Sequence, residues 1–219
     1  MTENDPVQEL ARIRGLMDRS TRFLSLSGLS GVFAGAVALA GAGLARYHMK
    51  TMLGPTSDVL TYGTGQGYTD ADELLLTLIM DAVLVLFIAL LGAFWFTWRR
   101  SRRTGQYLMD ASARRLMINM FVPLSVGGIF CLALFYYGLP GLVAPATLVF
   151  YGLALFNASK FTLDEIRWLG LSELVLGIVA LFWLEAGLMF WALGFGVLHI
   201  LYGGLMYLRH ERGPVAGEA

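Results

Sequence analysis

The feature that most constrains this chain of 219 residues is a series of long apolar stretches. Hydrophobic residues make up 57% of the chain and charged residues 15%, whereas a soluble domain carries about 25% charged residues. A helix needs about 20 mainly apolar residues to cross a bilayer, and its backbone groups must be satisfied within the helix. We therefore predict an all-α integral membrane bundle of six transmembrane helices. The expected spans are residues 23–45, 73–97, 115–136, 141–158, 164–185 and 187–208.

The two ends of the chain are expected to lie outside the six-helix domain, which we assign to residues 22–208. Residues 1–21 are predicted to form a cytoplasmic amphipathic helix, and residues 209–219 a cytoplasmic tail. Two interpretations of the first helix stay open: it lies on the membrane surface, or residues 1–20 dock a cytoplasmic partner. The apolar positions that recur there at helical spacing are Val7, Leu10, Ile13 and Met17.

The basic residues predict the orientation of the bundle. Of the 16 Lys and Arg residues, only Arg46 and Lys50 fall on one side of the predicted spans, which leaves 14 on the other side. Loops rich in Lys and Arg stay in the cytoplasm, so both termini are expected to be cytoplasmic. The residues on that side are Arg12, Arg14, Arg19, Arg22, Arg99, Arg100, Arg102, Arg103, Arg114, Arg115, Lys160, Arg167, Arg209 and Arg212.

Two segments of the second half of the chain align with each other. "GIFCLALFYYGL" begins at Gly128 and "GIVALFWLEAGL" begins at Gly177, and both carry Gly at the eleventh position. Each is followed by a span that contains a Tyr-Gly pair, at residues 151–152 and 202–203. This internal repeat predicts repeated helical hairpins that run in the same direction through the membrane.

The glycine pattern resembles that of the small six-helix bacterial membrane proteins of the acid-resistance HdeD type. The resemblance covers mainly residues 124–208, while the long connection at 46–72 and the arginine-rich loop at 98–115 depart from that compact plan. It implies a non-enzymatic protein of the bacterial inner (cytoplasmic) membrane that is linked to stress tolerance.

Three ionisable residues, Asp81, Glu173 and His199, fall near the middle of predicted spans. A charge at the centre of a membrane helix costs about 2.5–3.5 kcal/mol, so such groups normally face the protein interior. We predict that the three residues lie near one level of the bilayer and form a candidate polar site. Secondary candidates are Glu73, Thr77 and Tyr202.

Two interpretations of this polar site stay open. In the structural one, His199 is neutral and hydrogen-bonded, and Glu173 is protonated and paired with it. In the functional one, the three groups line a path for protons or hold a polar or cationic ligand. The matching positions of the first repeat are Leu124 and Leu148, so the hairpin itself does not need polar residues there.

No catalytic, cofactor-binding or metal-binding motif is recognisable, and we expect neither an enzyme nor a cofactor. The best interpretation is a small proton-linked transport or permeation protein. The alternative is a non-transporting stress-tolerance or regulatory subunit that docks a partner through its N-terminal helix. Besides lipid, a partner could be a second copy of the chain, packed through the GxxxG pair Gly31 and Gly35. The formal net charge of zero argues against a nucleic-acid partner.

Overall fold

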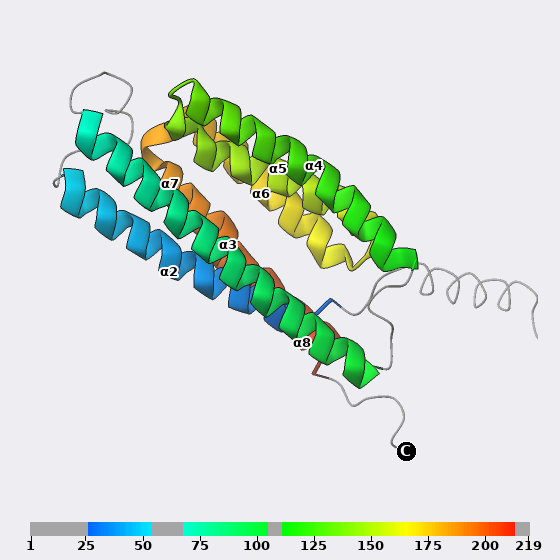
Figure 1. Ribbon diagram of the computed structural model, residues 1–219. Helices are drawn as coiled ribbons and strands as arrows, with labels where there is room; N and C mark the ends of the chain where they lie inside the picture. Colours follow the sequence, from blue (N-terminus) through cyan, green and yellow to red (C-terminus); the bar gives the residue numbers. More distant parts are fainter. Residues whose placement is uncertain (1–25, 54–67, 105–110, 213–219) are drawn as a thin grey trace, which may run out of the picture.

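The computed structural model describes residues 26–53, 68–104 and 111–212. Within these ranges the chain is helical and has no strand, which confirms the all-α prediction (Figure 1). The predicted helix at 1–21 lies outside the described residues. The main helices are α2 (Gly28–Leu53), α3 (Tyr68–Thr104), α4 (Ala111–Tyr136), α5 (Val143–Ala158), α6 (Asp164–Phe182), α7 (Gly187–Trp191) and α8 (His199–His210).

A short π-helix, η5 (Ala192–Leu198), joins α7 to α8, so that residues 187–210 form one return helix. Short 3-10 helices turn the chain before α5 and before α7, at η2 (Pro140–Leu142) and η4 (Leu184–Ala186). A third, η3 (Ser159–Phe161), separates α5 from α6.

Five of the helical segments described are long and apolar enough to cross a membrane, where the sequence predicted six spans. The exception is α6, whose 19 residues include Glu165, Arg167 and Glu173. The five segments are Gly28–Met52, Glu73–Arg103, Ala111–Tyr136, Pro140–Phe161 and Leu184–His210.

Several helices extend beyond the predicted spans. The first ends at Leu53 rather than at residue 45, and α3 runs from Tyr68 to Thr104 rather than over 73–97. Hydropathy marks the apolar part of a helix, and polar residues at its ends continue the same backbone hydrogen bonding. At the predicted start of the tail, α8 ends at His210, and Glu211 contacts Gly28 of α2 and Arg100 of α3.

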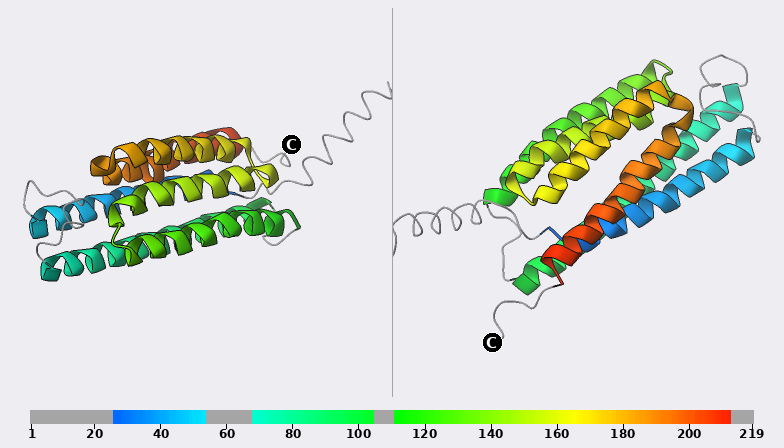
Figure 2. Two further views of the ribbon diagram at one scale, coloured as in Figure 1. Left: turned by 90° about the horizontal axis from the view of Figure 1, so that it is seen from above. Right: turned by 180° about the vertical axis from the view of Figure 1, so that it is seen from behind.

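The return helix joins two groups of helices (Figure 2). On one side, α8 and η5 pack against α2, which in turn pairs with α3. On the other side, α7, η5 and α8 contact α6, which packs on α5, and α5 pairs with α4. The outermost helices, α3 and α4, are therefore the least covered by the rest of the bundle.

Glycines allow α2 and the return helix to approach closely. A Cβ added at Gly31 would lie 3.2 Å from the Cα of Gly203, and one at Gly35 would lie 2.6 Å from the carbonyl oxygen of Gly196. The GxxxG pair is thus used for packing inside the chain. A homo-oligomer through this face stays a prediction, and it would require α8 to leave the face.

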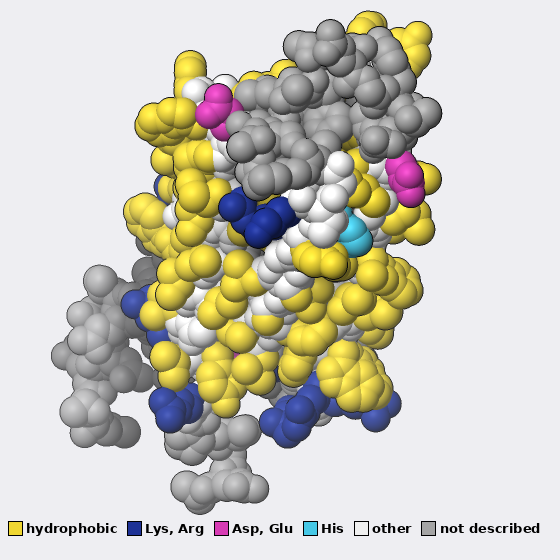
Figure 3. Space-filling model, turned by 90° about the vertical axis from the view of Figure 1, so that its left-hand side faces the viewer, with side chains coloured by type: hydrophobic (Ala, Val, Ile, Leu, Met, Phe, Trp, Pro, Cys, Tyr) yellow, Lys and Arg dark blue, Asp and Glu magenta, His cyan; other side chains and the backbone are white. Residues whose placement is uncertain are grey.

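Exposed apolar side chains cover α3 and α4. Phe94 is 67% exposed, Phe121 70% and Leu132 69%. Hydrophobic side chains fill most of the coloured surface in Figure 3, and Lys and Arg side chains gather along its lower edge. In water such large apolar faces would be unfavourable, so the molecule needs an apolar environment or a partner around them.

Two acidic side chains hold the helices together at the end rich in arginine. Glu211 accepts hydrogen bonds from the Gly28 backbone N–H (2.5 Å) and the Ser27 hydroxyl (3.2 Å), and pairs with Arg100 (2.9 Å). The buried Glu165 of α6 lies 3.2 Å from Arg209 of α8. These contacts connect α2, α3, α6 and the end of α8.

Candidate functional site

Glu173 and His199 meet where α6 packs against the return helix. The Nδ1 atom of His199 lies 3.4 Å from Oε1 of Glu173. Glu173 is 0% exposed and His199 is 6% exposed, so both groups are removed from solvent and from the outer surface of the bundle. The predicted common level of these two residues agrees with this contact.

Tyr151 of α5 is a third member of the site. Its hydroxyl oxygen lies 2.8 Å from Nε2 of His199, on the opposite side of the ring from Glu173. Nδ1 also lies 3.1 Å from the carbonyl oxygen of Gly194. In an imidazolium both ring nitrogens carry protons, and Nδ1–H faces two acceptors, the Gly194 carbonyl oxygen and an ionised Glu173. When that proton moves to Glu173, the neutral ring keeps its proton on Nε2, which faces the Tyr151 hydroxyl oxygen.

The carboxyl group of Glu173 is not satisfied by hydrogen bonds. Among the described residues, neither of its buried oxygens has a partner with hydrogen-bond geometry. An ionised carboxylate in such a place is costly unless an opposite charge lies close by. The group is therefore either protonated beside a neutral His199 or ionised beside an imidazolium. Both forms of the pair have the same net charge.

Local backbone features make room for this pair. Gly194 lies in the π-helix η5, and a Cβ there would lie 2.5 Å from Cδ2 of Leu148 and 3.1 Å from Cδ of Glu173. The absence of a side chain at 194 lets the carboxyl group fit against the return helix. Single π-helical turns within α-helices often occur at functional sites.

Aromatic rings cover the histidine. Phe195 is stacked on His199 with ring centroids 5.9 Å apart, and its ring also lies 4.9 Å from that of Tyr151. Trp191 extends the row, 5.0 Å from Phe195. Rings from α5 and η5 therefore lie beside the histidine, and Trp191 of α7 continues the row.

Tyr151 was not among the predicted site residues, whereas Tyr202 was. The Tyr-Gly repeat marks both tyrosines equally, and only the packing separates them. The hydroxyl of Tyr202 lies 3.3 Å from Oγ of Ser172, away from the histidine. Leu148, the repeat counterpart of His199, is fully buried and also lies beside Gly194.

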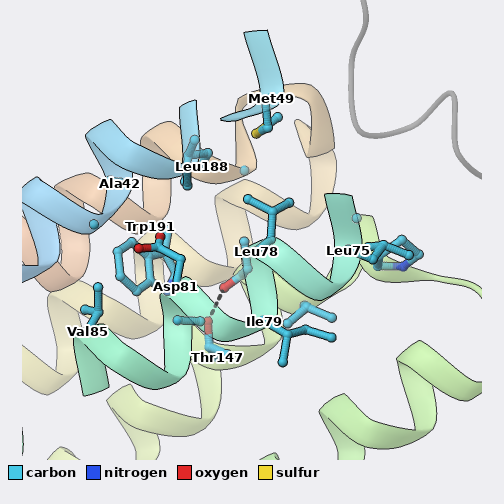
Figure 4. A pocket seen from close by; sticks show the side chains of 18 of the residues that line it. Ala42, Met49, Leu75, Leu78, Ile79, Asp81, Val85, Thr147, Leu188 and Trp191 are labelled. Carbon is cyan, nitrogen blue, oxygen red and sulfur yellow. Dashed lines mark hydrogen bonds between the residues drawn. The ribbon is translucent and has the colours of Figure 1, made fainter. Parts of the chain in front are cut away.

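Asp81 does not join Glu173 and His199. It lines a separate cavity of about 370 Å³ between α2, α3, α5 and the start of the return helix (Figure 4). Glu73 is exposed on the same helix, and the Thr77 hydroxyl donates to the Glu73 carbonyl oxygen (2.8 Å). The predicted three-residue site is thus divided between two places.

No grouping of three His, Cys, Asp or Glu side chains that could hold a metal ion occurs in the described part of the chain. No protein-family model, no curated protein and no solved structure matches the sequence. The resemblance to proteins of the HdeD type stays a prediction.

Proposed function

We propose that this protein is a six-span membrane protein in which Glu173 and His199 exchange a proton as part of proton-linked transport or permeation. The buried carboxyl–imidazole contact of 3.4 Å is the observation that carries the proposal. The bilayer location, the orientation and the transport step are all parts of the proposal.

The packing supports a bilayer location for α6 as well as for the five more apolar segments. Its charged groups are turned inward or placed at its end: Glu173 is fully buried, and Glu165 is held by Arg209. The apolar stretch that would cross the membrane begins at Trp168. One face of α6 packs against α5 and the return helix, and charged groups on that face point toward protein rather than lipid.

The distribution of charge supports cytoplasmic termini. Among the Lys and Arg residues that the structure describes, only Arg46 and Lys50 lie toward the end of the bundle where α2 ends and α3 begins. The opposite end carries the basic residues that end α3, begin α4 and end α8. Positively charged loops are retained in the cytoplasm, which places that end inside.

The arrangement of donors and acceptors supports proton exchange. The imidazole has Glu173 at Nδ1 and Tyr151 at Nε2, so a proton taken up on one side of the ring can be released from the other. The pair also offers two forms of equal net charge, which lowers the cost of holding a proton in a buried place. A carboxyl group with no other hydrogen bonds is free to take part in this exchange.

The test is proton flux into liposomes that contain the purified full-length chain and an internal pH-sensitive dye, driven by an imposed membrane potential. Wild-type vesicles should acidify faster than empty ones. His199→Ala and Glu173→Gln should each reduce the excess rate at least tenfold, and Tyr151→Phe should reduce it less. Tyr202→Phe is the matched control, because it removes the equivalent hydroxyl of the other Tyr-Gly pair.

Unchanged flux in both the Glu173→Gln and His199→Ala proteins contradicts the proposal. If wild-type vesicles show no flux, the alternative class is favoured: a non-transporting membrane subunit that docks a partner. That class predicts a stable complex that is lost when residues 1–20 are deleted.

A further inference from the structure

We propose that the cavity beside Asp81 binds a hydrophobic monovalent cation, with the carboxylate of Asp81 as counter-ion and the Trp191 ring as an aromatic wall. The cavity is distinct from the Glu173–His199 pair, since neither of these residues lines it. Binding there does not depend on proton exchange at that pair.

The size and walls of the cavity fit a small organic ligand. Its volume is about 370 Å³, within the range of ligand pockets, which are lined mainly by apolar side chains with a few polar groups. Asp81 of α3 and Trp191 of α7 both line this space (Figure 4). Apolar residues around them include Ala42, Ala45, Leu78, Ile79, Val85 and Leu188.

The charge of the lining residues selects a cation. Asp81 and Glu185 line the cavity, and no Lys, Arg or His is among its lining residues. In the described part of the chain Asp81 forms no ion pair, and it is half-buried, whereas Glu185 is exposed. The titratable group that interacts electrostatically with Asp81 is His48 of α2, which is not one of the residues lining the cavity. A carboxylate in an apolar wall attracts a positive charge more strongly than one in water.

The other polar and aromatic groups that line the cavity are also compatible with a bound cation. The Thr147 hydroxyl donates to the Ala144 carbonyl oxygen (2.7 Å), so its proton is already used within α5. The face of an indole ring attracts cations by about 0.5–2 kcal/mol, depending on desolvation. A quaternary ammonium or protonated amine with apolar substituents therefore satisfies the charge, the ring and the apolar walls together.

Trp191 also connects this cavity to the first site. Its ring lies 5.0 Å from Phe195, which is stacked on His199. A cation bound against Trp191 would therefore touch the row of rings that covers the histidine. The idea that this cation is the cargo driven by proton exchange rests on the proposed function, whereas the binding itself does not.

The test is equilibrium binding to the full-length protein in lipid nanodiscs at pH 7.5, measured by calorimetry. The probe is phenyltrimethylammonium, and tert-butylbenzene is its neutral counterpart of the same shape. The cation should bind at one saturable site, and tert-butylbenzene should compete at least tenfold more weakly. Asp81→Asn should weaken binding of the cation at least tenfold, and Trp191→Leu about threefold. Glu73→Gln is the control, because Glu73 is exposed on the same helix as Asp81 and does not line the cavity, and it should change binding less than twofold.

Equal affinity for the two probes, or unchanged affinity in a folded Asp81→Asn protein, overturns the proposal and marks the cavity as a purely apolar space. If Asp81→Asn does not fold, the comparison of the two probes on the wild-type protein still decides. Glu173→Gln and His199→Ala should retain cation binding. Binding without flux would contradict the proposed function alone, and flux without cation binding would contradict the present inference alone.

Discussion

The backbone of Gly194 lies directly against the carboxyl group of Glu173. A Cβ at residue 194 would approach Cδ of Glu173 to 3.1 Å and Cδ2 of Leu148 to 2.5 Å, so a side chain there requires one of these two side chains to move. The carbonyl oxygen of the same residue lies 3.1 Å from Nδ1 of His199. One glycine in the π-helix thus fixes the space for the acid and contacts the histidine.

Gly194→Ala is expected to disturb the Glu173–His199 contact, because the added methyl group must displace Leu148 or the carboxyl group. Overpacking of this kind costs about 1–3 kcal/mol. The thermal unfolding midpoint in detergent, followed by tryptophan fluorescence, should fall. Gly128→Ala is the control, because nothing lies within 4 Å of a Cβ at that position. Equal midpoints for the two variants would show that the site at 194 has room to adjust.

Adjacent glycines of α8 offer a matched test of the α2–α8 interface. A Cβ at Gly203 would lie 2.7 Å from the Gly28 carbonyl oxygen and 2.7 Å from the Val32 amide nitrogen, whereas nothing lies within 4 Å of one at Gly204. Gly203→Ala should therefore destabilise the protein by about 1–3 kcal/mol. Gly204→Ala should be neutral or stabilising by up to about 1 kcal/mol, because Ala favours a helix. Unfolding in mixed micelles measures both. A larger loss of stability for Gly204→Ala than for Gly203→Ala would contradict the packing of the Gly203 face of α8 against α2.

Glu211 is expected to stabilise the start of α2. Its carboxylate accepts the Gly28 N–H and pairs with Arg100, and the N-terminus of a helix favours a negative charge. Glu211→Gln should lower the free energy of unfolding by about 1–2 kcal/mol. Glu185→Gln removes an exposed carboxylate and should have little effect. Chain truncation before residue 211 should destabilise the protein at least as much as Glu211→Gln.

The pH dependence of stability should include a contribution from Glu165. Burial would raise the pKa of this carboxyl, but hydrogen bonds from a backbone N–H, His210 and Arg209 outweigh it and lower the pKa below the ordinary value of 4.5. A carboxyl with a lowered folded-state pKa adds stability above its unfolded pKa, and that stability is lost as the pH falls through the folded pKa. The unfolding midpoint of Glu165→Gln should therefore fall less than that of the wild type between pH 6 and pH 3. Parallel curves for the two proteins would rule out this contribution.

The fold was predictable from the sequence because long apolar stretches leave few alternatives to helices. Helix ends were less predictable, since the part of α2 after residue 45 contains Arg46, His48 and Lys50 and is still helical. The contact of Glu173 with His199 could be anticipated because the two residues lie in one predicted hairpin and at nearly the same estimated depth in the bilayer.

Tyr151 and the separation of Asp81 could not be predicted in the same way. Depth along a helix gives the level of a residue but not which helices are its neighbours. Asp81 lies on α3, which packs on α2, whereas Glu173 lies on α6, beside α5 and the return helix. The choice of Tyr151 over Tyr202 likewise depends on which helix faces His199, and the repeat treats the two tyrosines as equivalent.

Glu173 and His199 are proposed to act as one proton-exchanging pair. Proton flux measured side by side in Glu173→Gln, His199→Ala and the double variant tests this proposal most directly, since residues that act as a unit lose function in a non-additive way. Each single variant is expected to lose most of the flux, and the double variant is expected to lose no more than either single variant. Wild-type flux in one single variant, or losses that multiply in the double variant, would contradict it.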